Sequence, residues 1–381
     1  MSKSIQTLCV HGDGHRVTDH YDSLTMPIYQ TAAYSHTKLG HNDSGFDYTS
    51  ISNPTRSYLE ETISALEGAA ATVSFASGMA AINAVFELFS PGDRIVCSED
   101  LYGGTVLLFD SIARKNGLDL VMVDSTKPEL VAAAMTPATK AIYLETPSNP
   151  MMNVTDIRAC AAIAKAHGAL LIVDNTFLSP YFQNPIALGA DIVVHSGTKY
   201  LGGHNDTISG FLCLAAKDHE EQLRRIAYTL GGTLSPFDSY LMIRGIKTLA
   251  VRMEHQQKSA MAIARWLQTQ EQVEKVYYVG LPDHPGYETN ASQSRGAGAM
   301  LSFAMKTPEL ALQVLTKVQI ITFAESLGGP ESLITLPATQ THRDVAPVDR
   351  EKLGITDSFL RMSVGLESAE DLIADLKQAM A

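Results

Sequence analysis

Between residues 56 and 210, short runs of Ile, Val and Leu alternate with longer stretches in which apolar residues recur every three or four positions. The short runs are mostly continuous, as expected for strands buried on both faces, and the longer stretches have the period of helices. This alternation is typical of a mostly parallel sheet with crossover helices, so it predicts an α/β fold. The predicted strands are residues 94–97, 118–123, 141–144, 169–173, 191–194 and 210–214, and the predicted helices are 56–63, 78–89 and 156–167.

The chain changes character after residue 235. A helical pattern covers residues 236–268 with Gly245 as its only internal weak point, and we expect this helix to join two domains. Beyond it, strand-like runs at 273–279, 299–303, 320–323 and 359–364 alternate with helices at 309–318 and 370–379, which predicts a smaller α+β domain.

These patterns divide the chain into three segments. The first 50 residues have neither period and are expected to form an extended arm that contacts a neighbouring subunit. We therefore predict an arm at 1–50, a large domain at 51–245 and a small C-terminal domain at 246–381.

The charge balance argues against two classes of partner. Asp and Glu number 41 against 29 Lys and Arg, a formal net charge of −12, so neither a nucleic acid nor an anionic membrane is an expected partner. Charged residues make up 18% of the chain, below the roughly 25% of typical soluble domains, which indicates that an oligomer covers part of the surface. No apolar run approaches the ~18 residues of a membrane span, and the first residues lack the hydrophobic centre of a signal peptide. We therefore expect a cytoplasmic protein.

Cysteine and histidine patterns favour no metal site. None of the four cysteines belongs to a Cys-x-x-Cys pair, so buried free thiols are expected. His11 and His15 flank Gly-Asp-Gly without a third ligand, and we expect both to be solvated or structural.

One lysine stands out just beyond the predicted strand at 191–194. Ser196, Thr198 and Lys199 lie at the carboxyl end of that strand, the edge where open α/β sheets bind ligands. A lysine in an apolar pocket has a lowered pKa, because burial disfavours its ammonium form, and its free amine can attack a carbonyl to form a Schiff base. The hydroxyls beside it are suited to a phosphate. Taken alone, this segment leaves a solvated surface lysine as the alternative.

Three more segments are predicted to reach the same edge. Asp174 ends a buried run and is suited to a cation such as the protonated pyridine nitrogen of pyridoxal phosphate, with an N-cap or salt-bridge role as the alternative. Ser77, Gly78 and Met79 precede a helix whose free amides favour a phosphate, and an ordinary capped helix is the alternative. Tyr102 follows the strand at 94–97 and is equally suited to stacking on a planar ring or to the core.

In this order, these segments resemble the Cys/Met-metabolism family of pyridoxal-phosphate enzymes, which includes cystathionine γ-synthase and the cystathionine and methionine lyases. The resemblance covers nearly the whole chain and implies the aminotransferase-like fold type I, with a mostly parallel large domain and a smaller α+β domain. The motifs that carry it are Phe-Asp-Tyr at 46–48, Ser-Asn-Pro-Thr-Arg at 52–56, Ala-Ser-Gly-Met at 76–79, Glu-Thr-Pro-Ser-Asn-Pro at 145–150, Val-Asp-Asn-Thr at 173–176, His-Ser-Gly-Thr-Lys-Tyr-Leu-Gly-Gly-His at 195–204, Ser-Pro-Phe-Asp at 235–238, Arg-Gly-Ile-Lys-Thr-Leu at 244–249, Glu-Ser-Leu-Gly-Gly at 325–329 and Leu-Arg-Met-Ser-Val-Gly-Leu-Glu at 360–367.

The resemblance implies a role for each matching cofactor residue. Lys199 would bind pyridoxal phosphate covalently and move protons, Asp174 would pair with the pyridine nitrogen, and Tyr102 would lie against the ring and serve in catalysis and substrate binding as well. Contacts at the phosphate end would come from Ser77, Gly78, Met79, Ser196 and Thr198, and from Tyr48 of the adjacent subunit in a homotetramer built from dimers that share their active sites.

The same resemblance implies an amino-acid substrate site. Arg361 would clamp the α-carboxylate as a bidentate pair, with help from Asn149. Ser326 would orient Lys199, and Glu325 matches the family's substrate-facing glutamate.

Two positions depart from the family pattern. Most relatives have an arginine where this chain has Ser50, and that arginine crosses the subunit interface to the phosphate. Its loss is expected to weaken cofactor retention unless another cation, such as the nearby Arg56, substitutes for it. Leu107 stands where several cystathionine-using relatives have an arginine for the distal carboxylate, which puts specificity for cystathionine in doubt.

The predicted reaction is γ-replacement on an O-acylhomoserine by cysteine or another thiol, as in cystathionine γ-synthase. The segments at 323–329 and 336–342 favour this reaction. The alternative is a carbon–sulfur lyase, such as cystathionine γ-lyase, cystathionine β-lyase or methionine γ-lyase, that releases a 2-oxo acid and ammonia. Ser196-x-x-Lys199 also matches penicillin-recognising acyl enzymes, but their Ser-Asp-Asn and Lys-Thr-Gly companions are absent. A protein that keeps the fold without catalysis is a further alternative, suggested only by Ser50.

Overall fold

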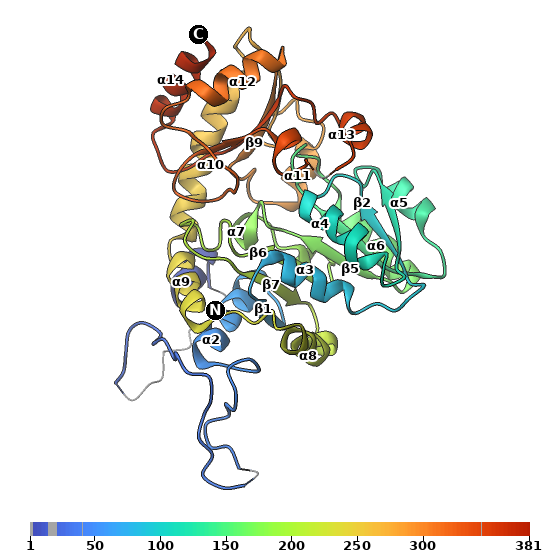
Figure 1. Ribbon diagram of the computed structural model, residues 1–381, viewed down its shortest axis with the longest axis vertical. Helices are drawn as coiled ribbons and strands as arrows, with labels where there is room; N and C mark the ends of the chain where they lie inside the picture. The colour runs from blue at the N-terminus through green and yellow to red at the C-terminus, as the bar shows by residue number, and fades with distance from the viewer. Residues whose placement is uncertain (1–2, 14–20, 40, 344) are drawn as a thin grey trace.

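A seven-stranded sheet forms the centre of the larger part of the molecule (Figure 1). The computed structural model describes residues 3–13, 21–39, 41–343 and 345–381. The strand order is β1-β7-β6-β5-β4-β2-β3; the five strands from β6 to β3 are parallel, and β7 is antiparallel to both of its neighbours. The predicted mostly parallel sheet is therefore confirmed. Its strands are β1 (Ala71–Phe75), β2 (Arg94–Ser98), β3 (Asp119–Val123), β4 (Thr139–Glu145), β5 (Leu170–Asp174), β6 (Ile192–Ser196) and β7 (Gly210–Leu214).

The first strand, β1, was not predicted. In its sequence, Ala-Thr-Val-Ser-Phe, polar Thr and Ser alternate with apolar residues, yet all five residues are buried. The polar groups are buried because they have partners: the Ser74 hydroxyl donates to Glu60 Oε1 at 2.7 Å, and the Thr72 and Ser64 hydroxyls lie 2.7 Å apart. These partners come from helix α2 (Pro54–Glu67), so the strand cannot be recognised from its own residues alone.

Helices cover both faces of the large sheet. Apolar side chains of α2 (Pro54–Glu67), α5 (Pro128–Ala134) and α6 (Ile157–His167) pack on one face, and those of α3 (Gly78–Phe86), α4 (Gly103–Leu108) and α8 (Glu220–Leu230) pack on the other. This arrangement leaves the carboxyl edge of the parallel strands open to the second, smaller part of the chain. The remaining helical segments of the larger part are the π-helical turn Phe109–Ala113, α7 (Ser179–Phe182), and the 3-10 turns Pro185–Leu188 and Lys217–His219.

The helix predicted over 236–268 is wrong in one respect, because two helices occupy this stretch. Helix α9 (Pro236–Ile246) and α10 (Leu249–Leu267) are separated by Lys247 and Thr248. Arg252 stabilises the break, since its guanidinium donates to the carbonyl oxygens of Gly245 at 2.9 Å and of Tyr200 at 2.8 Å. A side chain at position 245 would collide with the backbone, because a Cβ there would lie 2.1 Å from the Gly202 oxygen.

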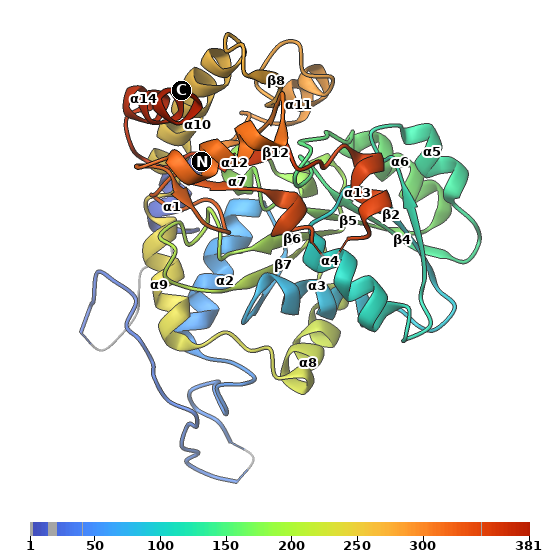
Figure 2. The ribbon, with the colours of Figure 1, turned by 45° about the horizontal axis from the view of Figure 1, so that its top comes forward.

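The C-terminal part is built on a five-stranded sheet with the order β10-β11-β12-β9-β8, next to the long α10 (Figure 2). This agrees with the predicted smaller α+β unit, although the exact boundaries at residues 50 and 245 stay predictions. Its elements are β8 (Val273–Tyr277), α11 (Tyr287–Gln293), β9 (Met300–Met305), α12 (Pro308–Lys317), β10 (Thr322–Phe323), β11 (Leu333–Thr335), the 3-10 turn Pro337–Thr339, α13 (Pro347–Leu353), β12 (Phe359–Ser363) and α14 (Ala369–Met380).

The N-terminal segment is only partly extended. Helix α1 (Ile5–His11) was not predicted; it packs on α2 and α10 and buries Cys9. Residues 21–39 and 41–50 then project from the body of the molecule (Figures 1 and 2), and Tyr21, Leu24 and Leu39 on this projecting arm are almost fully exposed. Contact between the arm and a neighbouring subunit stays a prediction.

Other expectations can be compared with the described residues. All four cysteines are buried and free, as predicted. His15 lies outside the described residues, and among the residues described no group of three or more His, Cys, Asp or Glu side chains is arranged to hold a metal ion. Within the same part of the chain, no helix combines the length and apolarity needed to cross a bilayer.

Candidate active site

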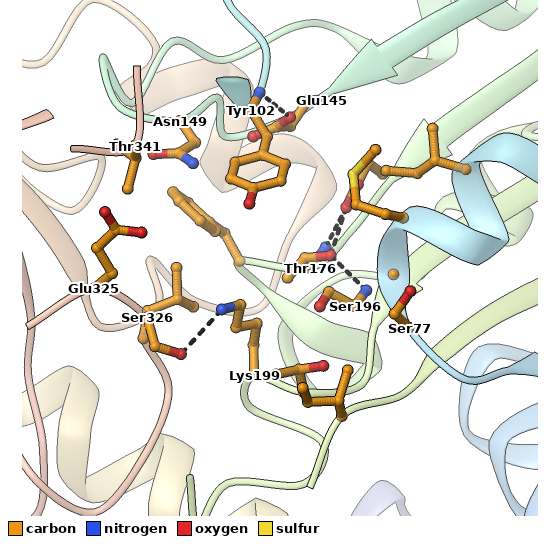
Figure 3. A pocket seen from close by; sticks show the side chains of 18 of the residues that line it. Ser77, Tyr102, Glu145, Asn149, Thr176, Ser196, Lys199, Glu325, Ser326 and Thr341 are labelled. Carbon is orange, nitrogen blue, oxygen red and sulfur yellow. Dashed lines mark hydrogen bonds between the residues drawn. The ribbon is translucent and has the colours of Figure 1, made fainter. Parts of the chain in front are cut away.

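A cavity of about 310 Å³ lies at the carboxyl edge of the large sheet, where the smaller part of the chain covers it (Figure 3). It brings together every predicted site residue except Tyr48. Tyr48 lies on the projecting arm, is 47% exposed and does not line this cavity. The residues that line it are Ser77, Gly78, Met79, Ile82, Tyr102, Glu145, Asn149, Asp174, Thr176, Phe177, Ser196, Thr198, Lys199, Ile208, Glu325, Ser326, Leu327, Thr341 and Arg361.

Lys199 follows β6 and points its amine into the cavity. Its Nζ donates to Ser326 Oγ at 3.0 Å, and Ser326 has a positive φ of 105°, a left-handed backbone that side-chain-bearing residues rarely adopt. Burial, with a smaller contribution from Arg361, lowers the pKa of Lys199 to about 8. The side chain of Lys199 is therefore partly buried, and its amine loses its proton at a lower pH than that of a solvated surface lysine.

Asp174 ends β5 beside Lys199 and is buried. Its Oδ1 accepts two hydrogen bonds from Thr176, from the backbone N–H at 3.0 Å and from the hydroxyl at 2.6 Å. The Thr176 hydroxyl also accepts the Ser196 N–H at 2.9 Å, which connects the ends of β5 and β6. Burial raises the pKa of Asp174 while the Thr176 hydrogen bonds oppose this rise, so a cationic partner in the cavity would favour the charged carboxylate.

An anion cradle forms where α3 meets the end of β6. The Ser77 hydroxyl caps the helix by accepting the Ala80 N–H at 3.0 Å, while the first amides of the helix have no intrahelical partner. Gly78 allows Ser196 to approach this helix end, because a Cβ at position 78 would lie 2.9 Å from the Ser196 Cβ. Thr198 also lines the cavity, and its hydroxyl donates to the Ser209 oxygen at 3.2 Å and accepts the Ser209 N–H at 3.0 Å. That hydroxyl thus supports the loop that carries Lys199.

Tyr102 is not a core residue. It precedes α4, is 39% exposed, and its ring faces the cavity opposite Lys199 (Figure 3). Its backbone N–H donates to Glu145 Oε2 at 2.9 Å. The ring is therefore held in a place where a planar group in the cavity would contact its face.

Arg361 on β12 forms the opposite wall. It is fully buried, and its guanidinium donates to Asn149 Oδ1 at 2.8 Å and to the Ser326 carbonyl oxygen at 3.2 Å. Burial lowers its pKa to about 10, so the guanidinium is still charged at neutral pH. Glu325 lines the cavity next to Ser326. A fixed buried guanidinium of this kind is suited to a carboxylate.

The arrangement fits pyridoxal phosphate. The α3 end and Ser196 match its phosphate, Lys199 its aldehyde, Asp174 its ring nitrogen and Tyr102 its ring face. Gly78 is the sharpest sign, since any larger residue would fill the space between the helix end and Ser196. The cavity offers each end of the molecule a group of the right chemistry.

Three polar cavity residues were missed in the sequence. Glu145 ends β4 and Thr176 follows β5, and both belong to the family motifs at 145–150 and 173–176. Asp174 was predicted because ligands bind at the carboxyl ends of such strands, and the same reasoning could have found these two residues. Thr341 comes from the C-terminal part and lies in the segment 336–342, which was singled out only for its resemblance to the synthases; its carbonyl oxygen fits against α4 only because residue 103 is glycine.

The structure places the residues at the two departures from the family pattern, and in the described part of the same chain it shows no substitute for either missing arginine. Leu107 on α4 is 52% exposed and does not line the cavity. Arg56 is buried and donates to the carbonyl oxygens of Leu234 at 3.1 Å and Thr49 at 2.6 Å. Arg56 therefore anchors the base of the projecting arm, and in its own chain it does not replace the arginine missing at Ser50.

The lowered pKa of Lys199 predicts how its amine reacts in cofactor-free protein. Neutral amine appears as pH rises through about 8, whereas ordinary lysines require about pH 10.4. Brief labelling with an amine-reactive reagent, followed by peptide mass spectrometry, is expected to give half-maximal modification of Lys199 near pH 8. The other lysine-containing peptides serve as internal controls. If the peptide containing residue 199 titrates together with them, the amine is not desolvated as described.

Comparison with known proteins gives the same assignment over the whole chain. The model of the family described as "Cys/Met metabolism PLP-dependent enzyme" matches residues 6–381. The cystathionine gamma-lyase of Bacillus subtilis (strain 168) is 45% identical over 375 residues, which cover 98% of each chain. The cystathionine beta-lyase of Lactococcus lactis subsp. cremoris (strain MG1363) is 45% identical over 377 residues, which cover 99% of each chain.

Solved structures agree with these relatives. The cystathionine gamma synthase of Xanthomonas oryzae pv. oryzae in complex with cystathionine superposes with a TM-score of 0.96 and 40% identity, over 100% of this chain and 98% of that chain. The predicted fold type I is confirmed by this similarity. The chain belongs to the family of Cys/Met-metabolism enzymes that depend on pyridoxal phosphate.

Proposed function

We propose that this protein catalyses transsulfuration at the γ-carbon of an amino-acid substrate, with γ-replacement on an O-acylhomoserine by cysteine as its main reaction. The observation that carries the proposal is the convergence of Lys199, Asp174 and Arg361 on one cavity. Arg361 can hold an α-carboxylate, and Lys199 is linked to the same wall through Ser326. An amino acid bound by its carboxylate therefore places its α-carbon within reach of the lysine amine.

Each residue has a distinct task in this proposal. Bound pyridoxal phosphate supplies the electron sink that makes the α-proton of the substrate acidic. Arg361, fixed by Asn149, orients the carboxylate, and Asp174 holds the charge of the ring nitrogen. Lys199 takes the α-proton and passes protons between carbons, which its lowered pKa permits at neutral pH. The hydrogen bond to Ser326 Oγ keeps the Lys199 amine next to the wall where Arg361 would bind the substrate.

A carbon–sulfur lyase is the second candidate, and a specific observation favours it. Synthase and γ-lyase both remove the α-proton and then expel the γ-substituent; they differ in whether a thiol adds or water releases a 2-oxo acid and ammonia. A β-lyase instead expels the β-substituent. The solved Xanthomonas oryzae proteins are named cystathionine gamma synthase. The curated relatives from Bacillus subtilis and Homo sapiens, the latter 47% identical over 360 residues, are named cystathionine gamma-lyase.

Product analysis separates the two reactions. Purified holoenzyme is incubated with O-acetylhomoserine or O-succinylhomoserine plus cysteine, and separately with cystathionine, homocysteine and methionine, and each product is identified by mass. The proposal expects cystathionine from an O-acylhomoserine plus cysteine, at a rate above that of 2-oxo acid release from cystathionine. The reverse order of rates would assign the protein to the lyases. No turnover of any substrate would contradict both candidates.

We also propose that active sites are shared in a homotetramer of paired chains. Tyr48 lies on an exposed projecting arm and away from the cavity of its own chain, so a neighbouring chain is the remaining place for it to act. In such a dimer, the site that contains Lys199 of one chain contains Tyr48 of the other.

Subunit complementation tests the sharing. Lys199→Ala and Tyr48→Ala chains are each expected to have little activity. If they are unfolded together and refolded as a mixture, sharing predicts recovery of about one quarter of wild-type activity, because half of the pairs are mixed and each mixed pair has one intact site. No recovery, with dimers present by sedimentation, would mean that Tyr48 does not act across the interface.

Ser50 provides a separate test of the phosphate end. Ser50→Arg is expected to slow cofactor loss by about ten- to a hundredfold, because a charge-assisted contact contributes about 1.5 to 3 kcal/mol. Dialysis against a carbonyl scavenger, followed by absorbance, measures the loss. Ser35→Arg adds the same charge at an exposed position of the same arm and serves as the control. An equal rate in wild type and Ser50→Arg would show that another group already serves the phosphate.

A further inference from the structure

Glu145 and Asp174 end two neighbouring strands and face the same side of the sheet. They are the last registered pair of the β4–β5 ladder, with the strands about 4.8 Å apart. Glu145 is 6% exposed and Asp174 is 7% exposed. In the described part of the chain, neither carboxyl belongs to an ion pair. Two adjacent buried carboxyls without a cation between them cannot both be ionised at low cost.

The hydrogen bonds decide which of the two carries the charge. Asp174 accepts both the N–H and the hydroxyl of Thr176, which favour its anion. Glu145 accepts the Tyr102 N–H at Oε2, with a smaller contribution from the backbone of Asn149, and among the described residues no hydroxyl donates to it. Burial and the neighbouring Asp174 raise the pKa of Glu145 well above its usual range, in agreement with this division.

The surrounding groups do not reverse the assignment. The buried guanidinium of Arg361 interacts with Glu145 through its charge, but its hydrogen bonds go to Asn149 and to the Ser326 carbonyl oxygen. Asp100 is a further buried acid, and its charge also raises the pKa of Glu145. The titratable and charged groups that act on Glu145 or are acted on by it are Asp174 from β5, Asp100 from the loop after β2, Tyr102 at the start of α4, Tyr143 within β4 and Arg361 from β12.

We propose that Glu145 is a positioning residue that works as a neutral carboxylic acid. Its carbonyl oxygen accepts the Tyr102 N–H (Figure 3) and would thereby fix the tyrosine ring over the cofactor. Its neutrality leaves Asp174 as the one anion opposite the ring nitrogen. This inference rests on the proposed function only in assuming that pyridoxal phosphate occupies the cavity.

Two substitutions separate neutrality from charge. Glu145→Gln keeps a neutral oxygen acceptor of the same reach. Its dissociation constant for the cofactor is therefore expected to stay within about threefold of the wild-type value. The pH dependence of the absorbance of its bound cofactor is expected to stay near that of wild type. Glu145→Ala removes the acceptor and is expected to weaken cofactor binding by about tenfold. Glu60→Ala is the matched control, because Glu60 is a buried acid that accepts the Ser74 N–H outside the cavity. It is expected to lower thermal stability without weakening cofactor binding.

Infrared spectroscopy of the cofactor-free protein at neutral pH measures the protonation itself. The wild-type minus Glu145→Gln difference spectrum is expected to contain the carbonyl band of a protonated carboxylic acid. A carboxylate band in its place, or cofactor binding in Glu145→Gln as weak as in Glu145→Ala, would overturn the proposal. Because neither measurement uses substrate, failure of the proposed transsulfuration would leave this outcome unaffected.

Discussion

The hydrogen bond from Lys199 Nζ to Ser326 Oγ joins the two sheets of the molecule and is the contact on which the site depends. Lys199 follows β6 of the large sheet, and Ser326 follows β10 of the small one. Ser326 also accepts from Arg361 through its carbonyl oxygen, so one residue with a strained backbone holds both the amine and the carboxylate clamp. The cavity therefore exists only while the two sheets keep this relative position, and the burial that results gives the lysine its low pKa.

The large sheet supplies the rest of the geometry through its strand ends. Parallel strands deliver Glu145, Asp174 and Ser196 to one edge, and the amino end of α3 meets them there because residue 78 is glycine. One cavity is thereby lined by groups of different chemistry: the anion cradle at α3, the acid Asp174 at the end of β5 and the guanidinium of Arg361 on β12. Pyridoxal phosphate can place its phosphate in the cradle, its ring nitrogen at Asp174 and its aldehyde at Lys199, which leaves the guanidinium of Arg361 for a substrate carboxylate. This is why the family assignment and the cavity agree.

Much of this could be predicted from the sequence, for physical reasons that also explain the failures. Strands such as β6 are buried on both faces and read as continuous aliphatic runs, so their ends, and the residues that follow them, could be located. Strand β1 could not, because its buried Ser and Thr depend on partners in α2. The break between α9 and α10 depends on Arg252 reaching two carbonyl oxygens, which no local pattern reveals. Thr341 reaches the cavity only through packing of the smaller part against α4, so the segment 336–342 could be recognised without showing that Thr341 lines the cavity.

The central claim is that the Lys199 amine binds the cofactor aldehyde. Holoenzyme reduced with borohydride, digested and mapped by mass spectrometry tests this most directly, because reduction makes the bond between amine and aldehyde permanent. The account predicts a phosphopyridoxyl group on the peptide that contains residue 199. A holoenzyme whose reduced cofactor is found on another lysine, or on none, would contradict it.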